Sequence, residues 1–517
     1  MLDLSHRRCC SGGPGLGKSS RNICNVRDIV QRAPLQSPRW IQVQSASPST
    51  AASTKAPEDK FIATTWGRFQ QDAPQHDPSI AALHASSWSA IPTMRMPSTR
   101  NEEYRFTDIS PLLKSTVVPA QNEVPVSSEL VSSLVPEEAA TTCAVVVNGV
   151  LRQELSNLSG LQKAHGAYVG GLAGAPKDVT AKLGQLSASR GGPFALLNGG
   201  AARDALVVSL PQGVAVETPL YVLHLTSAGA PGTTNSSAPR MLLHAGKGAS
   251  CTLIEEFVGL NEDGTAAALE ASPEQAQQPP YLCNNVAEMF LESKSQVTHS
   301  LASRDGPGGA NFKSTFVSQA RKSSYNLTEA RLGGMLTRHD LCVVQEGMLT
   351  ETNMRHFVLA GANQLHDLHT QLHLDHPEGQ ADQLHKCIVT SPTGRGVFDG
   401  NVRVNQKAQR TDAGQLSRNL LLAPKATVNV KPNLMIIADD VKCTHGCAVS
   451  DLSEEELFYF RARGISAISA RQALVASFGA EVTQRLSTKA VVERVRTDML
   501  RTLATVDLVG LTNAREA

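Results

Sequence analysis

Soft metal ligands are concentrated in one short segment near the end of the chain. Cys443, His445 and Cys447 stand at alternate positions of the run VKCTHGCAV. Thiolate and imidazole are ligands that iron–sulfur clusters and soft metals accept. Alternate residues of a β-strand point to the same side, so a strand would present Cys443 and His445 on one face. The pattern predicts a metal or cluster site at His445 and Cys443, with Cys447 as a weaker candidate. The alternative for Cys443 is a small buried core residue.

A second group of potential ligands is the run QLHDLHTQLHLDH, which carries His366, His369, His373 and His376. On a helix these spacings of three, four and three would line one face, as zinc ligands do. The run lies in a region rich in short strands, where alternation would divide the histidines into two opposite pairs. We expect hydrogen-bonded or solvated strand histidines here, and a metal site stays open as the alternative.

Residues 12–19, GGPGLGKS, match the phosphate-binding pattern G-x-x-x-x-G-K-[ST]. That loop needs a buried strand before it and a helix after it, so that backbone N–H groups converge on phosphate. The preceding residues SHRRCC are polar and charged instead. We therefore interpret the match as accidental and expect no nucleotide on this chain.

The N-terminal segment has the composition of an organelle-targeting sequence. Residues 1–55 hold eight Arg or Lys but only two acids, and the segment ends in the serine-rich run SASPSTAASTKAP. Such a leader lacks the continuous apolar core of a secretory signal. We predict a transit peptide over residues 1–56. Composition does not separate plastid from mitochondrion, and the plastid stroma is the expected location.

Bulk composition limits the remaining classes of function. The net charge of +1 argues against a nucleic-acid-binding protein. No stretch of 18 apolar residues occurs, which argues against a membrane span. Ten cysteines are scattered over 517 residues, a pattern that favours reduced thiols over a disulfide framework.

The elements that must position the candidate ligands are mostly short strands. A mixed, partly helical region is predicted over 57–200, with Asn148 and Gly149 as a tight hairpin turn. Over 201–446, apolar strands recur every 10 to 15 residues between turns, as in a sandwich, a barrel or a β-solenoid. Residues 226–239 and 261–280 have the low-complexity composition of surface loops.

The last segment, 447–517, has helical patterning. Ser453 to Glu456 form a predicted capping box, and a second helix is expected to begin near Ser469. Leu474, Phe478 and Val482 recur at four-residue steps and form one apolar stripe. The stripe either docks a partner or packs on the chain's own β-domain, and patterning does not decide between them.

Several runs resemble the SufB/SufD family of the SUF iron–sulfur cluster assembly system. The strongest is AQRTDAGQLSRNLLLAPKATVNVKPNLMIIADDVKCTHGCAV, followed by EELFYFRARGISAISARQALVASFGAEV; both stand in the last quarter of the chain. PSTRNEEYRFTDI, CTLIEEFVGLNEDG and QLHKCIVTSPTGRGVFDGNVRVNQ also fit. The unbroken run DDVKCTHG is closer to the SufD branch than to SufB, and the resemblance extends over about 90–485.

The resemblance implies a mainly β protein: a right-handed parallel β-helix between an N-terminal helical or mixed region and a C-terminal helical domain. It implies a non-enzymatic scaffold that pairs with a SufB-type subunit through the β-helix and docks a SufC-type ATPase through the C-terminal helices. A cluster would assemble transiently at the SufB interface, where His445 matches the family histidine and Cys443 the adjacent cysteine. Cys447 departs from the small residue usual there.

A carbohydrate-cleaving β-helix enzyme is the alternative function. Such an enzyme needs paired acids or a calcium cluster in a groove. Asp439 and Asp440 are the acidic pair considered for this role. On a strand, neighbouring side chains would point to opposite faces.

Overall fold

A computed structural model describes residues 59–71, 77–121, 123–164, 166–269 and 279–504 of the chain. The predicted transit peptide and the glycine-rich run 12–19 lie outside these residues. Everything below concerns the compact unit that begins at Pro57.

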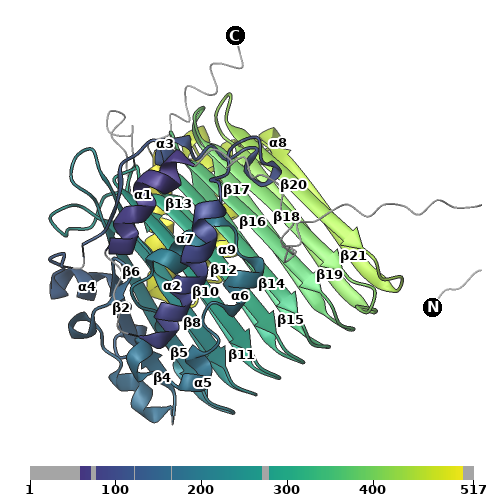
Figure 1. Cartoon of the computed structure of the whole chain (residues 1–517). Coiled ribbons are helices and arrows are strands. Elements are labelled where there is room, and N and C mark those ends of the chain that lie inside the picture. Colours follow the sequence, from purple (N-terminus) through teal and green to yellow (C-terminus); the bar gives the residue numbers. More distant parts are fainter. Residues whose placement is uncertain (1–58, 72–76, 122, 165, 270–278, 505–517) are drawn as a thin grey trace, which may run out of the picture. The chain divides into compact units, whose positions relative to one another are not determined.

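Two parallel sheets face each other and are built by strands that alternate between them, so that two strands make one turn (Figure 1). The result is a β-solenoid of about 7 turns, which confirms the predicted fold class. The first sheet holds β8 (Arg240–Ala245), β10 (Tyr281–Leu291), β12 (Ala310–Gln319), β14 (Leu336–Gln345), β16 (Leu365–Leu374), β18 (Arg395–Val404) and β20 (Thr427–Ile436). The second holds β9 (Ser250–Leu260), β11 (Gln296–Asp305), β13 (Ser324–Gly333), β15 (Glu351–Ala360), β17 (Gln380–Val389), β19 (Thr411–Leu421) and β21 (Val441–Ser450).

The strands that begin the solenoid and close its first edge are, apart from the 13-residue β6, short. They are β1 (Val117–Pro119), β2 (Cys143–Val147), β3 (Val150–Leu151), β4 (Tyr168–Gly170), β5 (Leu206–Leu210), β6 (Ala215–Ser227) and β7 (Thr234–Ser237). β3 pairs antiparallel with β2, and β4 pairs antiparallel with β5. Asn148 and Gly149 both have positive φ, 51° and 86°, as a two-residue hairpin requires. The run 226–239, expected as a loop, instead contributes the end of β6 and all of β7, which pairs with β1 and β10.

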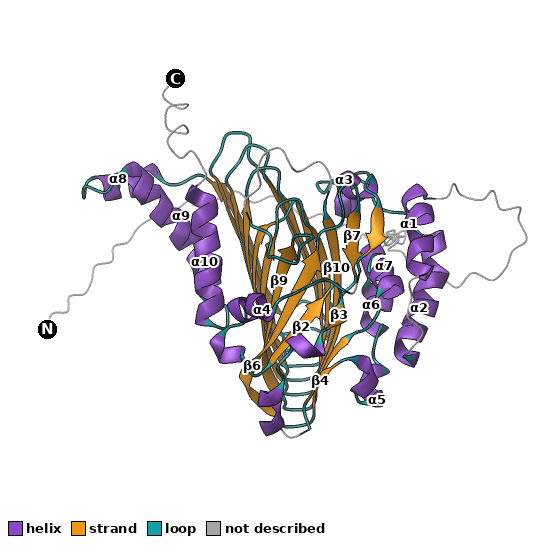
Figure 2. Cartoon of the chain, turned by 90° about the vertical axis from the view of Figure 1, so that its left-hand side faces the viewer, coloured by secondary structure: helices purple, strands orange, loops and turns teal. Residues whose placement is uncertain are grey.

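Helices cover the two outer faces of the solenoid (Figure 2). The first sheet is covered by N-terminal helices, and the second by the C-terminal helices together with one N-terminal helix, α4 (Ser128–Leu134). The N-terminal helices are α1 (Lys60–Gln71), α2 (Pro78–Ala90), α3 (Ser110–Leu113), α4 (Ser128–Leu134), α5 (Lys177–Thr180), α6 (Gln185–Arg190) and α7 (Pro193–Ala201). The C-terminal helices are α8 (Glu454–Arg461), α9 (Ala467–Thr483) and α10 (Lys489–Ala504). No helix of the described residues is both long and apolar enough to cross a membrane.

Between the sheets, apolar layers alternate with buried charged groups. Glu255 on β9 is fully buried and accepts from Lys313 Nζ on β12 at 2.9 Å. His299 Nε2 contacts the same carboxylate at 2.9 Å, and His224 Nε2 at 3.1 Å. Two turns beyond Glu255, Glu329 contacts Nδ1 of His356 at 2.9 Å. These contacts join strands of different turns and, for Lys313, of different sheets.

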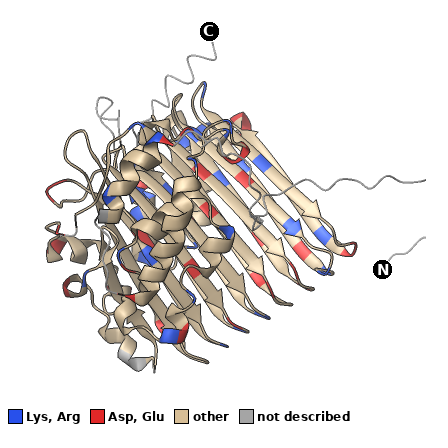
Figure 3. Cartoon of the chain, viewed as in Figure 1, with Lys and Arg blue, Asp and Glu red and all other residues tan. Residues whose placement is uncertain are grey.

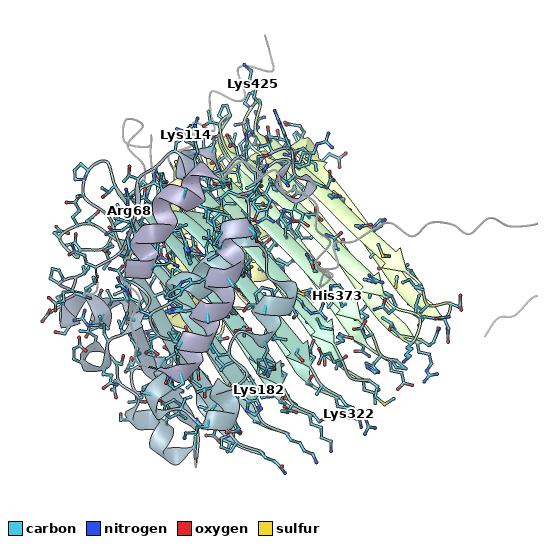
Figure 4. All side chains as sticks on the ribbon, in the orientation of Figure 1. Arg68, Lys114, Lys182, Lys322, His373 and Lys425 are labelled. Atoms are coloured by element: carbon cyan, nitrogen blue, oxygen red, sulfur yellow. The ribbon has the colours of Figure 1, made fainter. Side chains whose placement is uncertain are left out.

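Removing one partner of a buried ion pair leaves the other charge unpaired. Lys313→Met is therefore expected to lower the free energy of unfolding by about 3–5 kcal/mol, measured by urea denaturation. The double variant Lys313→Met/Glu255→Gln, which removes both charges, should recover part of that loss. Lys322→Met, an exposed lysine in the turn after β12, is the matched control and should be neutral (Figure 4). A neutral Lys313→Met would show that the pair contributes nothing to stability.

Candidate functional site

The last turn of the solenoid is open. β20 and β21 each pair on one side only, with β18 and β19 respectively, and the described residues provide no strand for their other edges. An unpaired strand edge presents a row of free backbone N–H and C=O groups. Charges of both signs lie along these last strands (Figure 3). Three apolar side chains here are strongly exposed: Ile436 and Ile437 at 45% each, and Val449 at 49%.

β21 carries all three predicted ligands. Cys443, His445 and Cys447 are register partners of Ala413, Gln415 and Ser417 on β19, which are buried between the sheets. The three candidates therefore share the inward face of the final turn, as their alternation predicted. Cys443 is half-buried and packs against the interior core, whereas His445 and Cys447 are exposed.

Solvent access distinguishes these two cysteines from the other five in the described residues. Cys143, Cys251, Cys283, Cys342 and Cys387 are buried. Burial raises the pKa of the Cys251 and Cys387 thiols to about 12. The pKa of Cys443 is raised by burial and by the nearby Asp412, and burial also raises that of Cys447. Both accessible sulfurs are thus held as thiols, and a metal that binds them must displace a proton.

Behind the candidate ligands the interior is polar. Gln415 Nε2 donates to Gln383 Oε1 at 2.9 Å, while the buried Gln415 Oε1 has no hydrogen-bond partner in the part of the chain that the structure describes. His385 Nδ1 lies 3.1 Å from Ser417 Oγ, next to the register position of Cys447. Neighbouring strands lie about 4.8 Å apart, so the free acceptor on Gln415 stands beside His445. An imidazole N–H that donated to it would fix the ring in one orientation for a ligand at the other nitrogen.

Sequence reasoning missed Gln415. Strand alternation within TDAGQLS would have placed it on the inward face, since Ala413, Gln415 and Ser417 alternate with more exposed residues. Nothing local to that segment reveals which residue of a distant strand stands beside it. The pairing of β19 with β21 is therefore needed to connect Gln415 with His445.

The four clustered histidines do not form a ligand set. His366 lies on β16 and points between the sheets, where its Nδ1 is 2.6 Å from Thr337 Oγ1. His369 and His373 alternate with it and face outward, and His376 follows the end of the strand (Figure 4). His369 Nε2 is 3.0 Å from Asp367 Oδ1; burial opposes its charge, but this carboxylate raises its pKa overall. Among the described residues no three His, Cys, Asp or Glu side chains are grouped as a metal site.

The acidic pair Asp439–Asp440 lies in the bend between β20 and β21, not on a strand. Both side chains are exposed, and the backbone there is tied to the preceding turn by Asp440 N–H to Gln409 Oε1 at 2.9 Å. The pair thus belongs to the bend that leads the chain into β21.

The C-terminal helices begin close to where the sequence predicted. Ser453 caps α8 by accepting from the Glu456 N–H, and Ser466 caps α9, which begins two residues before Ser469. In the apolar stripe, Val482 is fully buried and Phe478 half-buried in the core that α9 forms with the second sheet. Lys386 Nζ on β17 donates to Phe478 O at 3.0 Å.

Leu474 is half-buried. Phe478 and Val482 therefore attach α9 to the chain's own solenoid, which is the alternative that patterning left open. The apolar residues of this region that remain exposed are Phe458 (71%) and Tyr459 (56%) on α8, with Ile465 and Ile468 near the start of α9.

Comparisons with known proteins agree with this architecture. The family model for the SufBD N-terminal region matches residues 72–222, and that for the SufBD core domain of SUF-system iron–sulfur cluster assembly matches 226–478. The chain is 36% identical to the chloroplastic protein ABCI7 of Arabidopsis thaliana, over 91% of this chain and 96% of that protein. The chain belongs to the SufBD family.

Two further SufBD relatives carry names that state a process. An iron–sulfur cluster assembly SufBD family protein of Synechocystis is 33% identical over 78% of this chain and 87% of its own length. The iron–sulfur cluster assembly protein SufD of Escherichia coli is 26% identical over 77% of this chain and 88% of its own. A role in iron–sulfur cluster assembly is the function that these SufBD matches support, and the resemblance inferred from sequence is confirmed at this level.

Acid should destabilise this fold through buried histidines. Burial, with a smaller contribution from Arg331, lowers the pKa of His366 to about 3. The unfolded chain regains an ordinary value of about 6.5. Between these values the unfolded state binds the extra proton, so the free energy of unfolding falls as the pH drops, by about 2 kcal/mol for this residue at pH 5. His366→Gln should therefore lose less stability between pH 7 and pH 5 than the parent, as measured by urea denaturation. Equal losses would contradict a buried neutral His366.

Proposed function

We propose that this chain is a SufD-type, non-catalytic scaffold subunit that acts in a SufB–SufC–SufD-type complex. The observation that carries the proposal is the open last turn, which presents His445 and Cys443 on one face beside two unpaired strand edges. Such a turn is half of a site, because its inward-facing ligands have protein on only one side. A second subunit would supply the other half.

A SufB-type subunit is the proposed partner at β20 and β21. Free strand edges pair readily with edges of another chain. The exposed Ile436, Ile437 and Val449 add apolar area next to these edges. The first edge of the solenoid ends in short antiparallel strands, so it offers no comparable long edge. The geometry thus supports one preferred direction of pairing.

The iron–sulfur cluster is the cargo of this proposed site. His445 would offer an imidazole nitrogen, and Cys443 would offer a sulfur once its proton is displaced. Because the pKa of Cys443 is raised by burial and by Asp412, this thiol is a poor nucleophile in the isolated chain. That property suits a ligand better than a residue that attacks a sulfur donor. Cys447 stands on the same face, with more solvent access.

A SufC-type ATPase is the proposed partner at the C-terminal helices. α9 and α10 are attached to the second sheet, whereas α8 projects beyond it (Figure 2). Phe458 and Tyr459 on α8 are the most exposed large apolar side chains of the described residues. Exposed aromatic residues that a monomer leaves in solvent are typical of protein interfaces. The proposed docking surface is therefore α8 and the start of α9. The apolar stripe on α9 holds this surface in place by packing on the second sheet.

A plastid is the proposed location. The basic, acid-poor leader has the composition of a transit peptide, and the Arabidopsis relative is described as chloroplastic. Hydrolysis of ATP would belong to the separate ATPase subunit, with this chain holding no nucleotide.

Replacement of the proposed ligands tests the cluster site. His445→Ala should lower cluster loading of the reconstituted ternary complex by roughly tenfold without dissociating it. Cys443→Ser should have a smaller effect, and Cys447→Ala should be nearly silent because family members have a small residue there. The measurement is the iron and sulfide content of each purified complex. Normal loading with His445→Ala removes this residue from the mechanism, and loss of the complex makes it structural.

A charge on the open edge tests the SufB-type interface. Ile436→Asp should weaken binding of the SufB-type subunit by about tenfold, or about 1.4 kcal/mol, because the carboxylate loses water when the edge is covered. Met348→Asp replaces a similarly exposed apolar residue, at 37%, in the turn between β14 and β15 and should bind normally. Calorimetric titration gives both dissociation constants. Equal affinities for the two variants would place the interface elsewhere.

A further inference from the structure

A pocket of about 500 Å³ lies beside the proposed docking surface. Its walls come from the turn between β19 and β20, the end of β21 and the first half of α9. Most of the lining is apolar side chain or backbone; the charged residues in it are Lys425, Asp451 and Arg471. Lys425 is exposed and lies on the outer side of that turn (Figure 4).

Arg471 is the unusual member of this lining. Arg471 is 6% exposed, and its buried Nε has no hydrogen-bond partner among the described residues. No carboxylate of the described residues lies within ion-pair distance of its guanidinium. Other buried arginines of the described chain are paired: Arg240 contacts Glu288 at 2.7 Å, and Arg338 contacts Asp340 at 2.8 Å. Arg471 thus differs from these arginines, because its side chain faces a pocket and theirs contact an acidic side chain.

An unpaired buried cation is costly, because it loses water without gaining a counter-charge. Guanidinium has a planar set of donors that matches a carboxylate through two parallel hydrogen bonds. With Lys425 and Arg471 against the single carboxylate of Asp451, the charged lining of the pocket favours an anion. We therefore expect the partner of Arg471 to be a carboxylate on a group small enough to enter this pocket of about 500 Å³.

The surroundings indicate that this carboxylate belongs to a protein. Ile468, 44% exposed, stands three residues before Arg471 and so on the same side of α9. Val449 lines the pocket and is 49% exposed, and Phe458 and Tyr459 extend the apolar surface onto α8. A small free acid would gain nothing from this adjoining apolar area, whereas a protein surface would cover it. An arginine with aromatic neighbours is also a typical centre of a protein interface.

We propose that this pocket receives an Asp or Glu side chain of the SufC-type ATPase docked on α8 and α9, and that Arg471 is its ion-pair partner. The inference rests on the proposed function, since it identifies the chemistry that the docked partner must present. It assigns Arg471 a role in recognition and none in the stability of the free chain.

The test is calorimetric titration of the chain with the SufC-type ATPase of the same organism, at low and at high salt. Arg471→Met should weaken binding at least tenfold and reduce its salt dependence, with an unchanged or higher melting temperature because no internal ion pair is lost. Arg485→Met, an exposed arginine just beyond α9, is the matched control and should bind normally. Phe458→Ala should weaken binding through the apolar part of the same surface.

The outcomes separate the two levels of the proposal. Normal binding by Arg471→Met with weakened binding by Phe458→Ala overturns the pocket and keeps the docking surface. No binding by the parent chain overturns both. A melting temperature of Arg471→Met below that of the parent would also overturn the proposal. So would a loss of stability on deletion of residues 505–517, or a gain with 10 mM inorganic phosphate, that occurs in the parent but not in Arg471→Met. These results would assign the pocket to an internal or a free anion.

Discussion

Backbone hydrogen bonding between successive turns is the constraint on which this molecule depends. Each long strand is satisfied by the strands of the turn before and the turn after, so the stack must start and stop somewhere. At its start, β3 and β4 reverse direction and end the sheets. At its finish, the described residues supply no strand for the outer edges of β20 and β21. The candidate ligands lie on that last turn, so the candidate site is located where the two sheets end in unpaired strand edges.

Buried polar groups give the stack its register. A purely apolar interior would tolerate a slip of one turn against another, because many aliphatic layers are equivalent. Lys313 has to meet Glu255, and His356 has to meet Glu329, or charges are left unpaired in a dry interior. The same polar character continues to Gln383 and Gln415 and reaches the open end. These polar contacts end at Gln415, the register partner of His445.

Local sequence rules predicted the local features, whereas the strand pattern left a sandwich, a barrel and a β-solenoid open and only the family resemblance predicted the parallel β-helix. Asn148 and Gly149 make the expected hairpin, Ser453 caps the expected helix, and alternation placed Cys443 and His445 on one face, because each depends on neighbours in sequence. Features that depend on distant pairing were beyond reach. A period of two gives the face of Gln415 but not the strand beside it, and a helical stripe gives the apolar side of α9 but not what covers it. Arg471 was invisible for the same reason, since its lack of a partner is a property of three converging segments.

The chain's early residues are held by its late ones. Thr107 Oγ1 donates to Asp367 Oδ2 at 2.6 Å, Arg338 Nη1 to Glu103 O at 2.9 Å, and Lys431 Nζ to Glu102 at 2.8 Å, across 235 to 329 residues. Contacts of such long range form slowly, since the intervening chain must be ordered first. During synthesis from the N-terminus, Glu103, Thr107 and Glu102 can find these partners only after β14, β16 and β20, respectively, have been made. The segment around Tyr104 therefore stays incompletely packed until most of the solenoid has been synthesised.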